Sequence, residues 1–153
     1  MLLASTADAL TGAWFARQKH FPRASLQWLQ APAPPVLLAA CHWLDDYFAG
    51  RRPDIEKIPL APAGTPFQQR VWALLRDIPY GRTTTYGALA RRLAPQRMAA
   101  QAVGGAVGRN PLSIFIPCHR VLGSSGALTG YAGGLERKQR LLQHEGINLS
   151  PAS

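Results

Sequence analysis

Prolines divide this chain into an N-terminal and a C-terminal part. The segment Ala31-Pro32-Ala33-Pro34-Pro35 cannot lie inside a helix, because proline lacks a backbone donor and clashes with the preceding turn. Residues 51–64 contain three more prolines and show no hydrophobic period. A chain of 153 residues can form one full hydrophobic core, or a small domain attached to a larger one. We therefore expect an N-terminal module with its linker over residues 1–63 and a C-terminal module over residues 64–153.

The N-terminal module is expected to combine short strands with one helix. Residues 1 to about 30 include the apolar run Ala13–Ala16, with Gly12 and Pro22 as breakers on either side. From Val36 to Phe48, apolar residues recur every three or four positions, which predicts a helix that ends at Gly50. Its predicted inward stripe comprises Leu37, Ala40, Cys41, Leu44 and Phe48. On this stripe Cys41 is expected to be a small core residue.

Three helices are predicted in the first half of the C-terminal module. Thr65 followed by Pro66 is typical of a helix start, and this helix should end before Ile78. Two short helices follow at about residues 85–93 and 97–107, with a break at Ala94-Pro95-Gln96. A helix, a short turn and a second helix are the layout of a helix-turn-helix unit.

The helix predicted at residues 97–107 has an unusual outer side. Its inward stripe comprises Ala99, Ala102, Val103 and Ala106. The opposite side comprises Arg97, Gln101, Gly104, Gly105 and Gly108. Glycine inside a helix costs about 1 kcal/mol relative to alanine, so three glycines here indicate a surface that another backbone or a groove approaches closely. Tight packing of this helix inside the protein is the alternative interpretation.

Positive charge is concentrated in the C-terminal part of the chain. The formal net charge is +9, and residues 64–153 contribute +8 of it through eleven basic and three acidic side chains. A surface of this kind favours a polyanionic partner. The alternative is a basic surface kept for solubility, which would not need to be confined to one part of the chain.

A thiol and an imidazole lie side by side in Pro117-Cys118-His119-Arg120-Val121. The apolar run at residues 113–116 predicts a short buried strand that leads to Cys118. Pro117 makes the turn rigid, and His119 and Arg120 are expected to supply positive charge that favours a thiolate. Cys118 is therefore a candidate nucleophile. The alternative is that Cys118 fills the core, since free cysteine is among the most buried residue types.

The sequence predicts neither a metal site nor a membrane span. It contains no CxxC pair, and its four histidines lack metal-ligand spacing, so we expect no metal and no cofactor. No apolar run approaches membrane-spanning length, and residues 1–8 lack a basic leader region. We expect a cytoplasmic protein with reduced cysteines and no membrane partner. No coiled-coil pattern is present, and we expect a monomer.

The stretch from Gly64 to Gly146 resembles the C-terminal domain of the O6-alkylguanine-DNA alkyltransferases. The matching pieces are, in order, Thr65-Pro66-Phe67-Gln68, Ile78-Pro79-Tyr80-Gly81, Thr85-Tyr86, Ala102-Val103-Gly104-Gly105-Ala106, Asn110-Pro111, Ile116-Pro117-Cys118-His119-Arg120-Val121, Gly130-Tyr131-Ala132-Gly133-Gly134, Leu141-Leu142 and His144-Glu145-Gly146. The N-terminal third is similar to the variable domain of that family through Gly12, Trp14-Phe15 and Tyr47-Phe48. The resemblance implies a ribonuclease-H-like α/β N-terminal domain. It also implies a mainly α C-terminal domain with a helix-turn-helix and a short active-site strand.

This resemblance implies direct repair of double-stranded DNA that contains alkylated guanine. Cys118 would attack the alkyl carbon on O6 and keep the alkyl group as a thioether, so each molecule would act once. O4-alkylthymine is a further candidate substrate. His119 resembles the base of the family, linked to the sulfur through a bridging water, and Glu145 resembles the carboxylate that orients this histidine.

The resemblance also implies roles for the residues around Cys118. Asn110 would be a hinge between the recognition helix and the active site, and Tyr86 would donate its hydroxyl to a base flipped out of the duplex. The base pocket would include Val121, Tyr131, Ala132 and Gly133. The DNA-binding residues would be Arg97, Gln101, Ala102, Gly104, Gly105 and Arg109. Gln101 occupies the position where the family usually has an arginine that fills the vacated space, and Arg97 is a candidate substitute.

The sequence leaves two alternative functions from other classes. A non-catalytic alkyltransferase-like protein would bind the lesion with a similar domain, but members of that group lack the reactive cysteine. A Cys-His hydrolase would need an oxyanion site and would turn over repeatedly. A hydrolase would also leave the groove-binding helix and the basic surface without an explanation.

Overall fold

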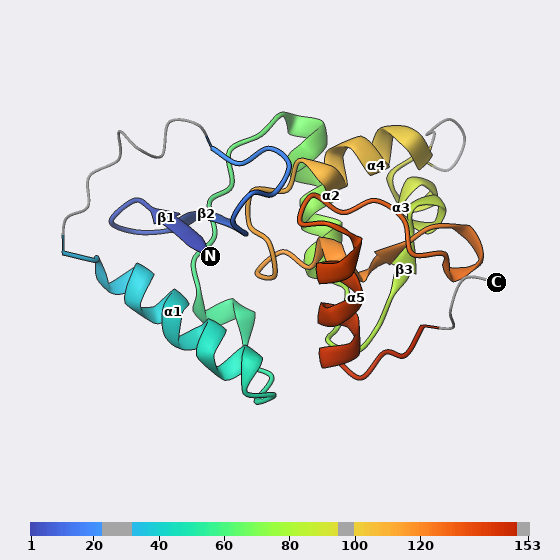
Figure 1. The fold of residues 1–153 in the computed structure, drawn as a ribbon. Helices are drawn as coiled ribbons and strands as arrows, with labels where there is room; N and C mark the ends of the chain where they lie inside the picture. Colours follow the sequence, from blue (N-terminus) through green and yellow to red (C-terminus); the bar gives the residue numbers. More distant parts are fainter. Residues whose placement is uncertain (23–31, 95–99, 150–153) are drawn as a thin grey trace.

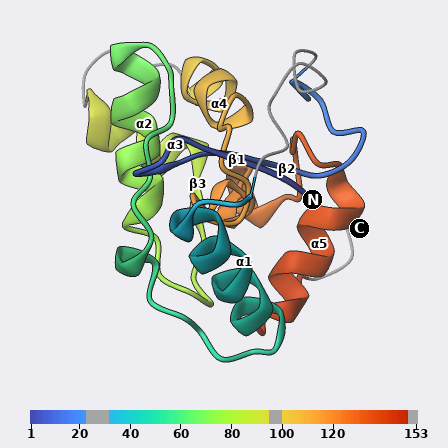
Figure 2. The same ribbon diagram turned by 90° about the vertical axis from the view of Figure 1, so that its left-hand side faces the viewer.

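The N-terminal hairpin and the first helix lie on one side of the molecule, and four helices lie on the other (Figure 1). The structure, a computed structural model, describes residues 1–22, 32–94 and 100–149. Figure 2 shows the hairpin crossing in front of the C-terminal helices, with the first helix beneath it. The fold is thus a mixed α/β arrangement of helices with two small sheets.

The expected N-terminal strands form an antiparallel hairpin. Strand β1 (Leu2–Ser5) pairs with β2 (Leu10–Trp14), with an irregularity between Ala4 and Ser5. The hairpin also binds the C-terminal part of the chain. The Ala13 amide donates to the Pro111 carbonyl at 2.8 Å, and the Ser113 amide donates to the Ala13 carbonyl at 3.0 Å. Strand β2 therefore supports the segment that leads to Cys118.

Helix α1 (Pro35–Phe48) begins one residue before the predicted start at Val36 and ends at Phe48 as predicted, but its buried face differs from the predicted stripe. The buried residues are Val36, Ala40, Trp43, Leu44 and Tyr47. Cys41 is exposed, so its prediction as a core residue is wrong. Apolar side chains surround much of this helix, and more than one stripe with spacings of three and four therefore fits the sequence. The hairpin and the C-terminal part select the stripe that is buried.

Helix α2 (Pro66–Arg76) confirms the predicted start at Thr65 and Pro66. The Thr65 hydroxyl accepts from the Gln68 amide, and the Gln68 side chain accepts from the Thr65 amide at 2.9 Å, which completes a capping box. The helix buries Val71, Trp72 and Leu75. The Trp72 indole donates to the Ala106 carbonyl at 2.9 Å, which ties α2 to the helix that contains the glycines.

The two short helices that follow α2 pack against each other as α3 (Tyr86–Leu93) and α4 (Ala100–Gly108). The predicted start of the second helix, with Arg97 and Ala99, lies outside the described residues. Helix α4 buries Val103, Ala106 and Val107. Ala102 is exposed, so its prediction on the inward stripe is wrong. Ala102 lies on the same outer side as Gln101.

The predicted active-site strand at residues 113–116 is a buried tight turn. Ser113 and Ile116 form an isolated β-bridge, and Ile114 between them has a left-handed φ of 74°. A short apolar run predicts that a segment is buried, but it does not specify the backbone conformation, so the predicted strand was wrong although the predicted burial was right. A short 3-10 helix, Cys118–Arg120, follows this turn. It leads to β4 (Val121–Leu122), which pairs in parallel with β3 (Thr84–Thr85).

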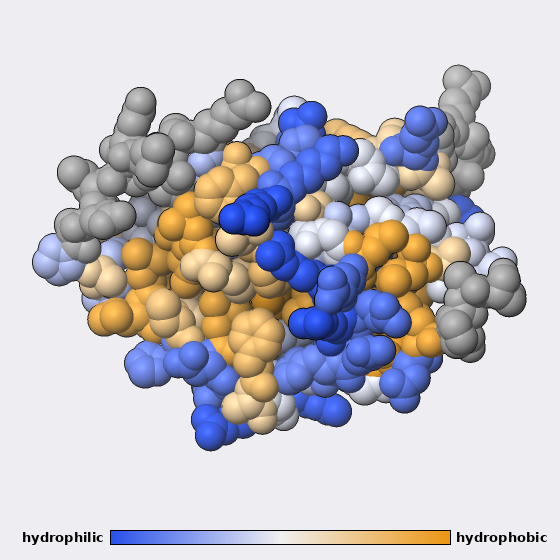
Figure 3. Space-filling model, in the orientation of Figure 1, coloured by the Kyte–Doolittle hydropathy of each residue, from blue (hydrophilic) through white to orange (hydrophobic). Residues whose placement is uncertain are grey.

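Helix α5 (Leu135–His144) completes the fold and buries Lys138, Leu141 and Leu142. One hydrophobic core links the two parts of the molecule, because side chains of β2, α1, α2 and α4 cluster with the turn before Cys118. The rings of Trp43 in α1 and Phe115 in that turn pack against each other, tilted by 31° with their centroids 4.8 Å apart. On the face seen in Figure 3, hydrophobic residues gather on the left over the N-terminal part. Within the described residues, no helix is long and apolar enough to cross a membrane.

Candidate active site

Cys118 lies in a cavity of about 750 Å³ between α4 and the loop that precedes α5. Cys118 is the first residue of the 3-10 helix and is only 5% exposed. The lining residues are Lys19, His20, Tyr86, Gly104, Gly105, Val107, Gly108, Arg109, Cys118, Gly130, Tyr131, Ala132, Gly134 and Leu135. A molecule that enters this cavity therefore meets Cys118 in its wall.

Asn110 holds the turn that positions Cys118. Its Nδ2 atom donates to the Ile116 carbonyl at 2.8 Å, and its Oδ1 atom accepts from the Leu112 amide at 2.9 Å. The Asn110 side chain also acts to lower the pKa of the Cys118 thiol. One buried amide thus fixes both ends of the turn that leads to Cys118.

Several groups act on the Cys118 thiol in opposite directions. Burial raises the pKa of the thiol and outweighs the Asn110 side chain, the positive charge of Lys138 and nearby backbone amides, which favour the thiolate. The thiol is therefore protonated near pH 7, and the expectation of a favoured thiolate is wrong. From the sequence, His119 and Arg120 were expected to supply the positive charge near the sulfur, and that prediction is wrong. Arg120 binds Glu145 instead, and Lys138 supplies the positive charge near the sulfur.

His119 and Glu145 form a buried pair in which Nε2 lies 2.7 Å from Oε1, with both side chains 0% exposed. Burial lowers the pKa of His119 despite the opposing effect of Glu145, so the ring is neutral near pH 7. Burial alone would raise the pKa of the Glu145 carboxyl. The hydrogen bonds and charges of His119 and Arg120 instead hold that pKa well below its usual range.

These protonation states determine the tautomer of His119. An ionised carboxylate only accepts hydrogen bonds, so the proton of the neutral ring is on Nε2. The Nδ1 atom then carries a lone pair, and it has no hydrogen-bond partner among the described residues. His119 can therefore accept a proton at Nδ1 while Glu145 stabilises the resulting imidazolium.

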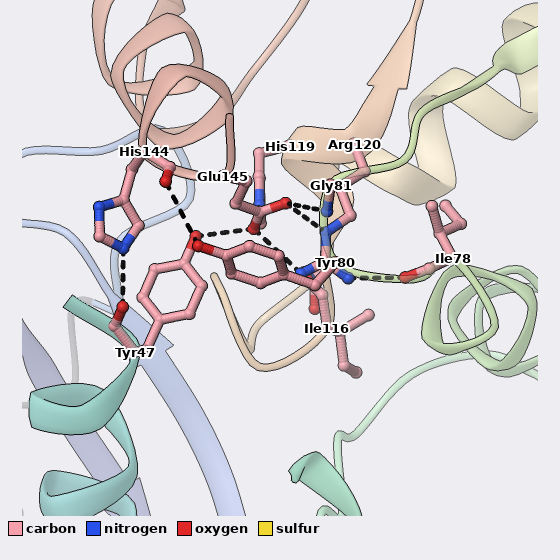
Figure 4. A network of polar contacts seen from close by, with 10 residues as sticks. Tyr47, Ile78, Tyr80, Gly81, Ile116, His119, Arg120, His144 and Glu145 are labelled. Atoms are coloured by element: carbon pink, nitrogen blue, oxygen red, sulfur yellow. Dashed lines mark hydrogen bonds and ion pairs between the residues drawn. The ribbon is translucent and has the colours of Figure 1, made fainter. Parts of the chain in front are cut away.

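Glu145 is the centre of a larger polar network (Figure 4). Arg120 binds both carboxylate oxygens, with Nε 2.8 Å from Oε2 and a terminal nitrogen 3.0 Å from Oε1. The Gly81 amide donates to Oε2 at 3.3 Å. Arg120 also donates to the Ile78 carbonyl at 2.6 Å, so the charge pair is fixed to the chain that follows α2.

Tyr47 connects helix α1 to this network, and sequence reasoning missed it. Its hydroxyl donates to Oε1 of Glu145 at 2.7 Å, and its carbonyl accepts from a ring nitrogen of His144 at 2.7 Å. Burial and the neighbouring Glu145 charge raise the pKa of Tyr47, which keeps its hydroxyl protonated as a donor. The N-terminal part of the chain therefore contributes directly to the orientation of Glu145.

Lys138 is a second residue that sequence reasoning missed. It is 0% exposed, and its ammonium donates to the carbonyls of Val121, Thr129 and Gly130 at 2.5, 2.7 and 3.0 Å. Burial lowers its pKa to about 8, while Cys118 acts in the opposite direction. The sequence could have predicted its burial, because Lys138 precedes Leu141 and Leu142 by three and four positions and so shares the inner face of α5 with them.

The predicted base-pocket residues divide into two groups. Tyr86, Tyr131 and Ala132 line the cavity, whereas Val121 and Gly133 are not among its lining residues. The Tyr86 hydroxyl donates to the carbonyls of Thr129 and Gly130 at 3.4 and 3.3 Å. A Cβ atom at Gly133 would lie 2.8 Å from the Tyr131 ring, so the missing side chain gives that ring its space.

The predicted DNA-binding residues of α4 are also divided. Gly104, Gly105 and Arg109 line the cavity, while Gln101 and Ala102 are exposed outside it. Arg97 lies outside the described residues. A Cβ atom at Gly105 or Gly108 would have no neighbour within 4 Å among the described residues. The alternative of tight internal packing therefore does not explain these two glycines.

A metal-binding cluster is absent from the part of the chain that the structure describes, where no group of three or more His, Cys, Asp or Glu residues could hold an ion.

Comparisons with known proteins identify related sequences. The family model "6-O-methylguanine DNA methyltransferase, DNA binding domain" matches residues 66–147. A methylated-DNA–protein-cysteine methyltransferase of Haemophilus influenzae is 44% identical over 147 residues, which are 96% of this chain and 80% of that protein. A Shigella flexneri protein of the same name is 54% identical over 106 residues, which are 69% of this chain and 61% of that protein.

Solved structures show the same relationship. The crystal structure of Mycobacterium tuberculosis OGT in complex with DNA superposes with a TM-score of 0.80 at 43% identity, over 94% of this chain and 84% of that one. The structure of an O6-methylguanine DNA methyltransferase from Methanococcus jannaschii has a TM-score of 0.61 at 26% identity. That match spans 99% of this chain and 97% of the other.

Proposed function

The chain belongs to the 6-O-methylguanine DNA methyltransferase family, and from this membership we propose that it repairs DNA by accepting an alkyl group from O6-alkylguanine on Cys118. The bond between the alkyl carbon and O6 breaks, and a carbon–sulfur bond forms. The observation that carries the proposal is the position of Cys118 in the wall of the cavity, next to the buried pair of His119 and Glu145.

Proton transfer follows from the tautomer of His119. The free lone pair on Nδ1 accepts the proton of the Cys118 thiol through a bridging water, and Glu145 stabilises the imidazolium at Nε2. The thiolate then attacks the alkyl carbon, and Tyr86, which lines the same cavity, donates a proton to the departing guanine. Asn110 and Lys138 act as positioning residues, because Asn110 holds the turn before Cys118, Lys138 binds the carbonyls of Val121, Thr129 and Gly130, and both favour the thiolate.

The product explains why each molecule acts once. The alkyl group on Cys118 is a thioether, which has no acyl carbon that water could attack. The stable carbon–sulfur bond leaves no route back to the free thiol in this site. The protein is thus both catalyst and acceptor, and it is consumed by one reaction.

The DNA partner is double-stranded DNA, which we place against the outer side of α4. A base stacked in a duplex cannot present O6 to Cys118, so the damaged nucleotide must be flipped into the cavity at a cost of a few kcal/mol. The absence of a Cβ atom at Gly105 and Gly108 lets the helix approach the minor groove closely. Gln101 lies on this exposed side, and its neutral amide cannot supply the charge that an arginine would bring to the flipped state.

Two domains complete the proposal. Residues 1–63 form a ribonuclease-H-like α/β domain with its linker, and residues 64–153 form the domain for DNA binding and alkyl transfer. The match of the family model to residues 66–147 supports a C-terminal domain that starts near residue 64. The continuous hydrophobic core and the contact between Tyr47 and Glu145 support a fixed arrangement of the two domains.

The mass of the intact protein tests this function against the two other classes. The protein is mixed with a limiting amount of a duplex that contains O6-methylguanine, and with an excess. A transferase gains one methyl group per molecule and then stops, and Cys118→Ala gains none. A protein that binds the lesion without a change in mass would be a non-catalytic binder, and repeated turnover of an ester would indicate a hydrolase.

A further inference from the structure

The loop that follows β2 reaches from the N-terminal part to the rim of the cavity. We define this rim loop as residues 15–21. Its Lys19 amide donates to the Ala132 carbonyl at 2.9 Å, which joins it to the segment that precedes α5 (Figure 1). Both Lys19 and His20 line the cavity that contains Cys118. The N-terminal part of the chain thus contributes side chains to the entrance of the site.

A buried glutamine fastens the rim loop. Gln18 is 7% exposed, and its Oε1 atom accepts from the Phe15 amide at 2.7 Å. Its Nε2 atom donates to the Lys19 carbonyl at 3.3 Å. The Ser113 hydroxyl, from the turn before Cys118, lies 3.5 Å from the same Oε1. The rim loop is therefore held in one position relative to the sulfur.

The backbone of the rim loop is strained at two positions. Arg17 and His20 both have a φ of 61°, in the left-handed region that side chains with a Cβ atom adopt at a cost in free energy. Such conformations persist where the surroundings enforce them, and they concentrate at functional sites. In the rim loop this conformation directs consecutive side chains, Lys19 and His20, to the cavity.

The charges at the cavity entrance are all positive or neutral. Lys19 and His20 contribute from the rim loop and Arg109 from the segment after α4, while no aspartate or glutamate of the described residues lines the cavity. Within the described part of the chain, none of these three side chains forms an ion pair. Partial burial and the charges of Arg109 and Lys19 lower the pKa of His20. The entrance thus concentrates positive potential without an internal counter-ion.

We propose that Lys19 and His20 bind a DNA phosphate next to the nucleotide that enters the cavity, Lys19 as a cation and His20 as a neutral N–H donor, with Arg109 as the second cationic group at this entrance. The proposal rests on the proposed function, because it takes the ligand of the cavity to be a flipped nucleotide. The phosphate of that nucleotide must remain outside while its base enters. A pair of donors at the rim is placed to hold the phosphate there.

The test compares one lesion in two chemical forms, which are an O6-methylguanine duplex and O6-methylguanine as the free base. Lys19→Gln removes one charge, and His20→Asn keeps a residue that tolerates the left-handed backbone. The matched control is Lys57→Gln, an exposed lysine that does not line the cavity. The measured quantity is the second-order rate constant of methyl transfer for each form, at several salt concentrations.

The expected result is a change in the ratio of the two rate constants. Each rim variant lowers the ratio of duplex to free base by about 5- to 10-fold at 0.1 M salt, and Lys19→Gln lowers the salt slope for the duplex by about one. Lys19→Arg restores the ratio, and Lys57→Gln leaves it unchanged. A ratio equal to that of the wild-type protein in both rim variants would overturn the proposal, whether the two rates stay constant or fall together.

Binding of unmodified duplex separates this proposal from the proposed function. If the wild-type protein transferred no methyl group from either form, the assignment of Cys118 would fail. The affinity for unmodified duplex as a function of salt would still test the rim loop. An unchanged slope in Lys19→Gln would then overturn the phosphate site by itself.

Discussion

The Nε2 atom of His119 lies 2.7 Å from Oε1 of Glu145, and neither side chain is exposed to solvent. This contact directs the free lone pair of the imidazole to Nδ1, because an ionised carboxylate can only accept. Glu145 thus determines which nitrogen of His119 can act as the base. Glu145 is in turn held in place by hydrogen bonds from Arg120, Tyr47 and the Gly81 amide.

Glu145→Gln should impair both stability and alkyl transfer. The substitution leaves Arg120 buried without its carboxylate, and breaking a buried pair costs about 3–5 kcal/mol. It also removes the charge that stabilises the imidazolium, which should lower the transfer rate about 100-fold or more. Urea unfolding and quenched-flow kinetics measure the two effects. Glu136→Gln is the matched control, since its pair with Arg140 is exposed and contributes about 1 kcal/mol or less.

Tyr47→Phe should destabilise the protein more than it slows the reaction. The hydroxyl is a buried donor to a carboxylate, and such bonds contribute about 1.5–3 kcal/mol. Glu145 retains its other donors, so the transfer rate should fall less than in Glu145→Gln. Urea unfolding gives the comparison with Tyr80→Phe, whose hydroxyl donates at 3.3 Å to the His144 carbonyl. Equal losses of stability in the two variants would argue against a role for Tyr47 at the site.

Stability should fall as the pH is lowered from neutrality. Burial lowers the pKa of His119, so below about pH 6.5 the unfolded chain binds a proton there that the folded protein does not. The pKa of Glu145 is also lowered, and its contribution is lost below about pH 4.3, where the unfolded carboxyl protonates. Both effects have the same sign. Urea unfolding between pH 7.5 and 4 should show a continuous decrease, and a constant free energy of unfolding between pH 7.5 and 5 would contradict the buried neutral imidazole.

Two substitutions at Gly105 should separate folding from DNA binding. Gly105→Ala should stabilise α4 by up to about 1 kcal/mol, since alanine is the better helix former and the added Cβ has no neighbour within 4 Å among the described residues. Gly105→Leu should also fold, but its side chain would block the approach of a groove. We expect its duplex affinity to fall about tenfold, or about 1.4 kcal/mol. Fluorescence anisotropy with unmodified duplex measures this, and wild-type affinity in Gly105→Leu would show that the helix does not enter the groove.

Local features of the sequence predicted the helices well. The cap at Thr65 lies next to Pro66, and both act within one turn, so the start of α2 could be read directly. The break after α3 was equally local, because Ala94 precedes Pro95. The adjacency of Cys118 and His119 is a covalent fact that identified the chemistry of the site before its geometry was known.

Features that depend on distant contacts could not be read in the same way. The exposed position of Cys41 follows from how α1 meets β2 and the turn before Cys118, and the periodicity of an apolar helix does not specify that. The contact between Tyr47 and Glu145 joins residues 98 positions apart. Lys138 compensates its burial with three backbone carbonyls from elsewhere in the chain, so only the folded structure explains its charge.

The two cysteines provide the most direct test of the account. The protein is reacted with a duplex that contains O6-methylguanine carrying an isotopically labelled methyl group, then digested and mapped by mass spectrometry. Cys41 is exposed and Cys118 is buried, so general thiol reactivity would favour Cys41. We predict one labelled methyl group on the peptide with Cys118 and none on the peptide with Cys41. Label on Cys41, or an unlabelled Cys118 after complete binding of the duplex, would contradict the assignment of Cys118 as the acceptor.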